Sequence, residues 1–218
     1  MSTINFSGYN WLVKDSGNTP TGSSNNLYSS RCVVYNSGGL KLQIEQTNNN
    51  VYCAEIESQL AFGYGTYYFY LNSRIDYLAP NLVFGLSIYK DDNNEIDIEF
   101  SKWNNENTHN TQYVLQPISK SNHLHKFITK LNGDFSIHIL QWLPKEINYK
   151  SLHGHYNKQP KNGFIIQSWQ YKGADITKPT PDHKLHINLW RYKNNPIQKL
   201  STTSINYATI SGFKYVKM

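Results

Sequence analysis

The sequence predicts an all-β protein built from two packed antiparallel sheets, as a jelly roll or a related sandwich. Three observations support this fold class. No stretch of a dozen residues keeps an apolar stripe at helical spacing. Aromatic residues make up 14% of the chain, which contains 17 Tyr, and aromatic side chains suit half-buried strand positions. Clusters of Gly, Pro or Asn interrupt the chain roughly every 8 to 15 residues, as turns between short strands do.

Short turn sequences separate the strands predicted in the first half of the chain, which are 39–45, 53–60, 65–71, 82–89 and 95–100. The first of them follows an Asn-Ser-Gly-Gly turn, and the second and third flank a Gly-Tyr-Gly turn. The fourth and fifth flank the polar segment 90–94, as the two strands of a hairpin do.

Further strands are predicted in the second half of the chain at 112–117, 126–129, 135–142, 163–171, 183–192 and 210–216. The tripeptide Asn-Gly-Asp at 132–134 is a strong turn signal between two of them. No internal repeat or low-complexity linker divides the chain, so we expect residues 1–218 to form one domain. A sandwich of this length buries roughly 70% of the surface that its unfolded chain exposes, so it needs neither disulfides nor metals to hold a core.

The charge and hydropathy patterns exclude several kinds of partner. The formal net charge is +6, but the Lys residues are scattered without a basic run of five or more. We therefore expect a solvated basic surface and no nucleic-acid partner. No apolar run approaches 18 residues, and residues 1–12 lack the charged start and apolar stretch of a signal peptide. These patterns predict no membrane span and a protein that stays in the cytosol, and we expect a monomer.

The segment 94–100 alternates between acidic and apolar residues. Because side chains alternate across a strand, three carboxylates share one face and three apolar side chains enter the core. A strand that needs only a polar exterior would use Thr, Lys or Ser, since neighbouring carboxylates repel each other. A solvated acidic face remains one reading. A calcium site is another, because Asp91 and Asp92 lie just upstream, but the spacing does not match a calcium-binding loop.

Glycoside hydrolysis gives this arrangement of carboxylates a use. A retaining mechanism needs two carboxyl groups about 5–5.5 Å apart, one as nucleophile and one as general acid/base. Positions i and i+4 on a flat strand are roughly 13 Å apart, so the strand must bend and the Glu side chains must lean inward. An Asp between the two Glu residues can hold a proton and so separate their pKa values.

The motif Glu95-Ile96-Asp97-Ile98-Glu99 resembles the active-site signature of glycoside hydrolase family 16, which includes lichenases, laminarinases and agarases. The resemblance continues in order along the chain. It is carried by Cys32, by Gly-Leu-Lys-Leu at 39–42, Cys-Ala-Glu at 53–55, Phe-Gly-Tyr-Gly-Thr-Tyr at 62–67, Gln-Trp at 141–142 and Ile-Asn-Leu-Trp at 187–190. It therefore covers about 32–190 and implies the family's concanavalin A-like jelly roll.

The resemblance also implies roles for individual residues. Glu95 would be the nucleophile, Glu99 the general acid/base and Asp97 their electrostatic helper. The residues that match or adjoin substrate-contacting positions are Glu55, Gln112, Trp190, Trp103 and Asn26. Trp103 lies just past the acidic strand, where it would supply an aromatic platform or fill the core. Trp190 and Tyr192 would share the face opposite the buried Leu189, and a Trp190 packed in the core is the alternative.

Three positions depart from the lichenase pattern. Asn93 stands where lichenases carry Trp, Glu57 where they carry Arg, and Val114 where they carry Asn. These changes leave the predicted catalytic residues in place. They weaken the case for a lichenase substrate.

The resemblance implies a disulfide between Cys32 and Cys53, although the pair alone could equally be two free thiols. A disulfide would suggest a secreted, extracellular protein, against the missing signal peptide. The predicted chemistry requires no cofactor, and a structural calcium ion is compatible with the family. Two His pairs, His123 with His125 and His153 with His155, have strand spacing, but nothing in the sequence joins them into a metal site.

Two functions from different classes follow from the sequence. The first is a retaining, endo-acting glycoside hydrolase that cleaves a β-linked polysaccharide, with a β-1,3- or mixed β-1,3/1,4-glucan as the expected substrate. The second is a non-catalytic, lectin-like carbohydrate-binding module on the same fold. The intact acidic residues favour the enzyme, and the replaced cleft residues favour the binding module.

Overall fold

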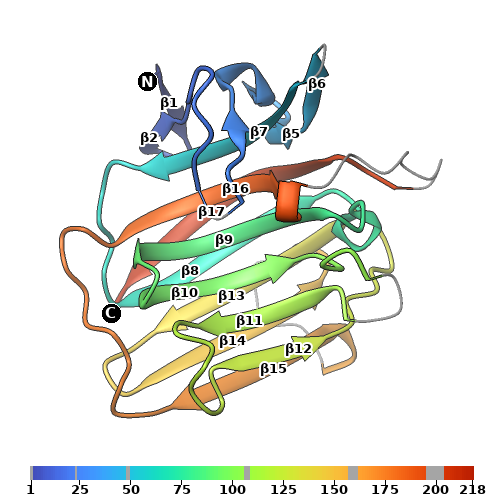
Figure 1. Ribbon diagram of the computed structural model, residues 1–218. Coiled ribbons are helices and arrows are strands. Elements are labelled where there is room, and N and C mark those ends of the chain that lie inside the picture. Colours follow the sequence, from blue (N-terminus) through green and yellow to red (C-terminus); the bar gives the residue numbers. More distant parts are fainter. Residues whose placement is uncertain (1, 23, 48–49, 106–108, 157–161, 195–203) are drawn as a thin grey trace.

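Two β-sheets lie face to face in the computed structural model of the protein (Figure 1). The structure describes residues 2–22, 24–47, 50–105, 109–156, 162–194 and 204–218. The sheet in the foreground of Figure 1 is called the front sheet below, and the sheet behind it the back sheet. The predicted all-β, two-sheet sandwich is confirmed.

The front sheet has ten strands, which are β1 (Ser2–Phe6), β2 (Tyr9–Val13), β3 (Leu27–Tyr28), β6 (Glu45–Thr47), β7 (Asn50–Ser58), β9 (Leu82–Asp91), β10 (Asn94–Phe100), β11 (Thr111–Leu115), β12 (Leu124–Phe127) and β16 (Lys184–Arg191). Its order is β1-β2-β7-β16-β9-β10-β11-β12, with β3 and β6 also paired to β7. The pairs are antiparallel except for β3 with β7. The hairpin β9–β10 lies near the middle of this sheet and forms as predicted.

The back sheet has seven strands, which are β4 (Val33–Asn36), β5 (Gly39–Gln43), β8 (Gly65–Asn72), β13 (Phe135–Trp142), β14 (Glu146–His153), β15 (Ile165–Lys172) and β17 (Tyr207–Lys217). Its order is β15-β14-β13-β8-β17-β5-β4. Four short 3-10 helices lie in connections, η1 (Ser30–Cys32), η2 (Ile75–Tyr77), η3 (Asn162–Phe164) and η4 (Tyr192–Asn194). No helix in the part of the chain that the structure describes has the length and hydrophobicity to cross a membrane.

Every predicted strand has a counterpart, and 135–142 matches β13 at both ends. The sequence prediction missed β1, β2, β3, β4, β6 and β14. The turn between β1 and β2 consists of Ser7 and Gly8, both with positive φ, and it lacks the Asn-Gly or Asp-Gly signature of such turns. In β14 the inward-facing Ser151 interrupts the apolar alternation, because it bonds the buried His138 and Tyr113.

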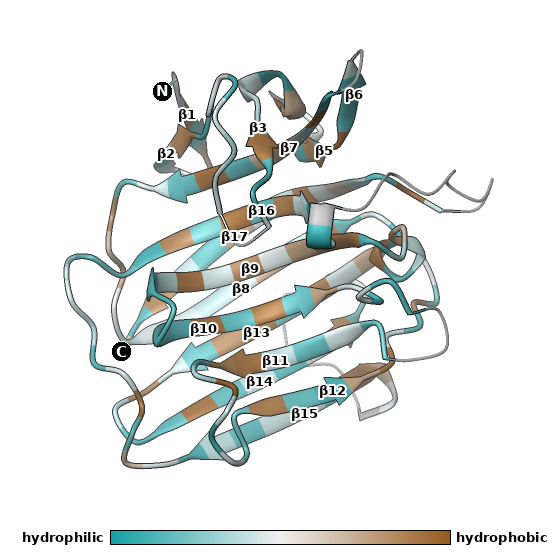
Figure 2. Ribbon diagram, viewed as in Figure 1, coloured by the Kyte–Doolittle hydropathy of each residue, from teal (hydrophilic) through white to brown (hydrophobic). Residues whose placement is uncertain are grey.

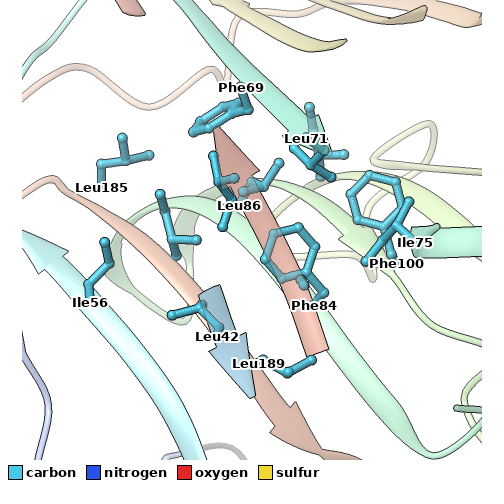
Figure 3. Close-up of a cluster of buried hydrophobic side chains, with 14 of the residues drawn as sticks. Leu42, Ile56, Phe69, Leu71, Ile75, Phe84, Leu86, Phe100, Leu185 and Leu189 are labelled. Carbon is cyan, nitrogen blue, oxygen red and sulfur yellow. The ribbon is translucent and has the colours of Figure 1, made fainter. Parts of the chain in front are cut away.

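The core fills the space between the two sheets. Apolar and polar residues alternate along β10 (Figure 2), so that Ile96, Ile98 and Phe100 are buried as predicted. Their neighbours in the core come from both sheets and point toward one another in Figure 3, where the labelled side chains include Leu42, Phe69, Leu71, Phe84, Leu86, Leu185 and Leu189. Burying a side chain of this size stabilises the fold by about 1.5–3 kcal/mol. The alternation therefore fixes which face of β10 remains available to solvent.

The expected disulfide between Cys32 and Cys53 is not formed, and both thiols are buried and free. Cys32 Sγ donates a hydrogen bond to the carbonyl oxygen of Tyr52, at 3.5 Å. Cys53 Sγ donates to Asn26 Oδ1, also at 3.5 Å. Each sulfur thus has an oxygen acceptor of its own. The resemblance to lichenases suggested a covalent link that the structure replaces with two weak hydrogen bonds.

Candidate active site

A cleft crosses the outer face of the front sheet. It has two adjoining parts, of about 630 and 800 Å³, which share Ser87, Glu95, Gln116, Asn188 and Trp190. The smaller part extends toward β12 and is called the β12 half. The larger part extends toward β7 and β2 and is called the β7 half. A chain-like ligand could therefore occupy the face on both sides of Glu95.

The three acidic residues of β10 line the β12 half of the cleft, and Glu95 lines both halves. Strand pairing places Glu99 opposite Gln112 of β11 on one side and Gly85 of β9 on the other. Gly85 is followed across the sheet by Asn188 of β16. A Cβ atom at Gly85 would lie 2.5 Å from Asn188 Oδ1, so only glycine leaves room for that amide beside Glu99.

The environment of the cleft changes the acidity of all three carboxyl groups. Burial raises the pKa of Glu95 to about 8 and that of Asp97 well above its ordinary value. A hydrogen bond between the two lowers the pKa of Glu95 and raises that of Asp97, so Asp97 is the donor. Asp97 is only 3% exposed, and its Oδ1 has no hydrogen-bond partner among the described residues. Asp97 thus keeps its proton while Glu95 is the first of the pair to ionise.

Glu99 is held in a different way. Burial raises its pKa, and the hydrogen bond from Gln112 Nε2 to Glu99 Oε2, at 2.6 Å, opposes part of that rise. Gln112 is itself only 8% exposed, which fixes the direction of its amide. A carboxyl group with a raised pKa keeps its proton to higher pH than an ordinary Glu does, which suits a general acid.

Glu55 lines the β7 half of the cleft, where both of its oxygens are already engaged. Lys14 Nζ lies 2.9 Å from Oε2, and His186 Nδ1 lies 3.1 Å from Oε1. Although burial alone would raise the pKa of Glu55, His186 and Lys14 hold it below its ordinary value. The other ring nitrogen of His186, Nε2, lies 3.9 Å from Glu57 Oε2. A charged network therefore forms this part of the cleft floor.

Three aromatic residues stand together along the cleft. Trp103 lies edge-on to Trp190 and to Tyr192, with ring centroids 6.4 Å and 5.2 Å apart. All three line the β12 half, and Trp190 also lines the β7 half. Leu189 is fully buried, so Trp190 points to the cleft face as the alternation predicted. Trp103 has a φ of 50°, a strained value for a bulky residue.

The structure brings most of the predicted site residues together. Glu95, Asp97, Glu99, Gln112, Glu55, Trp103 and Trp190 all line the cleft. Asn26 does not line it. This side chain is 1% exposed and donates through Nδ2 to the carbonyl oxygen of Arg191, at 3.0 Å, while it accepts from Cys53. Its contacts are structural because they join β3 and β7 to the end of β16.

Sequence reasoning missed several residues of the cleft floor, namely Gly85, Ser87, Gln116, His186 and Asn188. A signal existed for two of them. Gly85 and Ser87 are a glycine and a small polar residue at alternate positions of the otherwise apolar run 82–88 in β9. Both would have been placed on the face of the carboxylates if the hairpin register had been worked out.

The structure also shows where the three positions that depart from the lichenase pattern lie. Glu57 and Val114 line the two halves of the cleft. Asn93 is exposed in the β9–β10 turn, where its backbone N–H donates to Asp91 Oδ1 at 3.0 Å.

No cluster of three or more His, Cys, Asp or Glu suited to a metal ion occurs within the described residues. The two His pairs considered above have separate partners. His123 Nε2 lies 3.0 Å from the Tyr171 hydroxyl, and His125 stacks on Trp169. In the other pair, His155 donates to the carbonyl oxygen of Leu71.

No protein-family model matches this sequence, and no curated protein matches it either. Solved structures do. The structure is similar to a Bacillus licheniformis β-glucanase with a TM-score of 0.71 and 19% identity, over 100% of this chain and 99% of that one. A β-1,3-1,4-glucanase (lichenase) from a mouse hindgut metagenome gives 0.68 and 20%, over 95% and 93% of the two chains.

A glycoside hydrolase family 16 endo-glucanase from Bacteroides ovatus gives a TM-score of 0.60 and 15% identity, over 94% of each chain. The similarity spans almost the whole chain in each case, so it concerns the complete sandwich rather than one sheet. The chain therefore has the jelly-roll fold of the β-glucanases of glycoside hydrolase family 16.

Proposed function

We propose that this protein is a retaining, endo-acting glycoside hydrolase of the family 16 type. The observation that carries the proposal is the acidic face of β10. Three carboxyl groups with raised pKa values lie in one cleft, and Asp97 donates a hydrogen bond to Glu95. Perturbed carboxyl groups gathered in a cleft are typical of acid/base catalysis.

In the first step, the ionised Glu95 attacks the anomeric carbon and forms a glycosyl–enzyme ester. The glycosidic bond breaks, and Glu99 gives its proton to the departing oxygen. In the second step, Glu99 removes a proton from water, which attacks the anomeric carbon and releases Glu95. Asp97 supports both steps, because its hydrogen bond stabilises the Glu95 carboxylate before the ester forms and again after it is hydrolysed.

The cleft also supports a polymeric substrate. It extends on both sides of Glu95, so sugar units can bind before and after the cleaved bond. Trp103, Trp190 and Tyr192 offer flat apolar faces with polar edges, which suit sugar rings. The similar structures are a β-glucanase and a β-1,3-1,4-glucanase, and this similarity favours a β-1,3- or mixed β-1,3/1,4-glucan as the substrate.

A panel of polysaccharides tests the proposal. Purified protein is incubated with laminarin, lichenan, xyloglucan, agarose and a β-1,4-xylan, and new reducing ends are measured. We expect release from a β-glucan, with a rapid fall in viscosity because an endo-acting enzyme cuts within the chain. Proton NMR of the first product should show the β-anomer. An initial α-product would contradict the retaining mechanism.

A non-catalytic binding module is the second candidate. It is favoured by the three replaced cleft positions, of which Val114 brings an apolar side chain into the β12 half. The same panel separates the two functions. Binding to a glucan without release of reducing ends would establish the module and reject the hydrolase.

A further inference from the structure

Gln116 lies directly across the sheet from the proposed nucleophile. The register of β10 with β11 pairs Ile96 with Leu115. The next residue continues this pairing, because the backbone N–H of Gln116 donates to the carbonyl oxygen of Glu95 at 3.0 Å. Residues opposite each other on antiparallel strands point to the same face. The side chains of Gln116 and Glu95 are therefore neighbours in the cleft, and both line its two halves.

The side-chain amide of Gln116 has a fixed orientation. The backbone N–H of Ile118 lies 3.1 Å from its Oε1. Because a backbone N–H can only donate, this contact identifies the oxygen end of the amide. The other end, Nε2, carries two N–H donors and bonds no residue in the described part of the chain. Gln112 differs in this respect, because its Nε2 already bonds Glu99 on the same face.

The loop between β11 and β12 carries Gln116 and is held from outside the cleft by Asp175, which lies in the connection from β15 to β16. Asp175 Oδ2 accepts from Lys120 Nζ at 3.0 Å and lies 3.1 Å from His123 Nε2. Its other oxygen accepts from the hydroxyl of Tyr171 in the back sheet. Tyr171 and Lys120 hold the pKa of Asp175 well below its ordinary value, so this carboxylate is ionised at neutral pH. The loop is thus fixed to the rest of the sandwich at two of its residues.

The free end of the Gln116 amide suits a sugar. A ligand that crosses the junction of the two halves covers these N–H groups and removes their water. If the ligand offers no acceptor, the loss of hydrogen bonding weakens binding by roughly tenfold. A glycan offers hydroxyl, ring and glycosidic oxygens at this point, and each of them can accept from an amide N–H.

We propose that Gln116 is a further substrate-binding residue, whose Nε2 donates a hydrogen bond to an oxygen of the sugar that Glu95 attacks. Asp175 does not line the cleft, and it is a positioning residue that acts on the sugar only through Gln116. This proposal rests on the proposed function, because it assigns a role within the same cleft.

Gln116→Met tests the hydrogen bond, because it keeps the length of the side chain and removes the amide. The values of kcat and KM are measured from about pH 4 to pH 9 on laminarin and lichenan. We expect kcat/KM to fall about threefold to tenfold, the range for one hydrogen bond between neutral groups, without a shift in the acidic limb. Gln141→Met makes the same change in the back sheet and should leave kcat/KM unaltered.

The pH profile separates a bond to the sugar from a bond to the nucleophile. If Gln116 Nε2 served the carboxylate of Glu95, its loss would raise the pKa of Glu95 and move the acidic limb upward. Such a shift would overturn the proposal, and so would an unchanged kcat/KM.

A second variant keeps the bond that orients the amide. In the inactive Glu95→Gln protein, Gln116→Glu retains an oxygen for the N–H of Ile118 but has no N–H to donate. Calorimetry with laminaritetraose and a mixed-linkage glucan tetramer should show binding about threefold or more weaker than in Glu95→Gln alone. Equal affinity would mean that Gln116 only supports Ile118, and it would overturn the proposal.

A double-mutant cycle tests the role of Asp175. Asp175→Asn alone should lower kcat/KM about twofold to fivefold, mainly through KM, and should have no further effect in the Gln116→Met background. Lys120→Met, at a half-exposed side chain, should act in the same direction if Asp175→Asn lowers the thermal midpoint. Glu146→Gln breaks the contact with Lys172 in the back sheet and should leave kcat/KM unchanged in both backgrounds.

An effect of Asp175→Asn that persists in full in the Gln116→Met background would show that Asp175 does not act through Gln116. That result would overturn the positioning role. If the unmodified protein neither cleaves nor binds a polysaccharide of the panel, the proposed function fails and this proposal fails with it. If the protein cleaves one of them but Gln116→Met cleaves it equally well, only this proposal fails.

Discussion

Gln112 Nε2 donates a 2.6 Å hydrogen bond to Glu99 Oε2, and the two residues are direct neighbours on β11 and β10. The bond stabilises the ionised form of Glu99 and so opposes the effect of burial on its pKa. The pKa of Glu99 is thus set by burial, which raises it, and by this one amide group, which lowers it. This relationship can be tested without disturbing the strands, because only the side chain of Gln112 takes part.

Replacing Gln112 by Met removes the donor but keeps the length of the side chain. The pKa of Glu99 should rise further, so the proposed general acid stays protonated to higher pH. We expect the basic limb of the kcat/KM profile to move up by about 1 pH unit, the size expected for a hydrogen bond to a charged group. Gln141→Met in β13 is the control, because Gln141 bonds Thr66 and Asn148 away from the cleft. An unmoved basic limb in Gln112→Met would reject Glu99 as the acid.

Glu95→Gln and Glu99→Gln should each lower kcat by at least about 10³-fold, because nucleophilic and acid/base catalysis are lost outright. Sodium azide should partly restore activity to Glu95→Gly, since a small anion can take the place of the missing nucleophile. Near-full activity in either Gln variant would contradict the assigned roles. Circular dichroism and the thermal midpoint should confirm that both variants remain folded.

The raised pKa of Glu95 makes stability depend on pH. Its pKa is about 8 in the folded protein against an ordinary value of 4.5, so the folded state binds more protons between these values. The stability contributed by the protonated group is fully present below pH 4.5 and is lost as the pH rises through 8. Glu95→Gln removes this loss. The free energy of unfolding of Glu95→Gln should therefore equal that of the unmodified protein at pH 4 and exceed it at pH 9.

The difference at pH 9 should approach but not exceed about 5 kcal/mol, since each pKa unit corresponds to about 1.4 kcal/mol. Urea unfolding at the two pH values measures it. Glu146→Gln is a suitable control, because Glu146 lies in the back sheet, is partly exposed, and has a pKa that is lowered rather than raised. A Glu95→Gln protein that is less stable than the unmodified chain at pH 9 would show that Glu95 is not buried at a cost.

The two cysteines should behave as inert free thiols. Burial raises the pKa of Cys32 to about 11 and that of Cys53 to about 12, so almost no reactive thiolate exists at neutral pH. A thiol reagent such as DTNB should react with neither until the protein is unfolded, when two equivalents react. A reductant should leave the thermal midpoint unchanged. A fall of several degrees in reductant would instead reveal the disulfide that the family resemblance suggested.

Trp103 and Trp190 should both contribute to glycan binding. Titration of the Glu95→Gln protein with glucan oligosaccharides should change the Trp fluorescence. Trp190→Ala and Trp103→Ala should each weaken binding about fivefold or more, since each aromatic face is lost. Trp169→Ala is the comparison, because Trp169 stacks on Tyr149 in the back sheet and lies outside the cleft. Unchanged affinity in Trp190→Ala would remove that residue from the site.

The fold and the acidic face were predictable because they depend on local alternation. Six consecutive residues, 95–100, were enough to assign their side chains in β10 to the core or to the cleft. β14 was missed for the opposite reason. Its inward position at Ser151 serves a buried hydrogen-bond network with His138 and Tyr113, and a polar residue there resembles a loop in sequence.

The partners of Glu55 could not have been predicted. Lys14 and His186 lie 41 and 131 residues away in sequence, and they meet Glu55 only because β2 and β16 flank β7. For Asn26, in the same region, the resemblance to the family predicted the wrong role. A matching position suggested contact with substrate, but here its amide bonds the backbone of Arg191 and the thiol of Cys53.

Because acidic and apolar side chains alternate along β10, catalytic activity requires that this strand pairs in the correct register. A slip of one residue in the pairing of this strand would exchange its two faces, driving three carboxyl groups into the sandwich and three apolar side chains into water. A molecule misfolded in this way would have no activity, because the proposed nucleophile and the proposed general acid would both leave the cleft. The activity per milligram of refolded protein should therefore be proportional to the fraction of molecules in which β10 has the correct register. An activity assay can then measure the refolding yield.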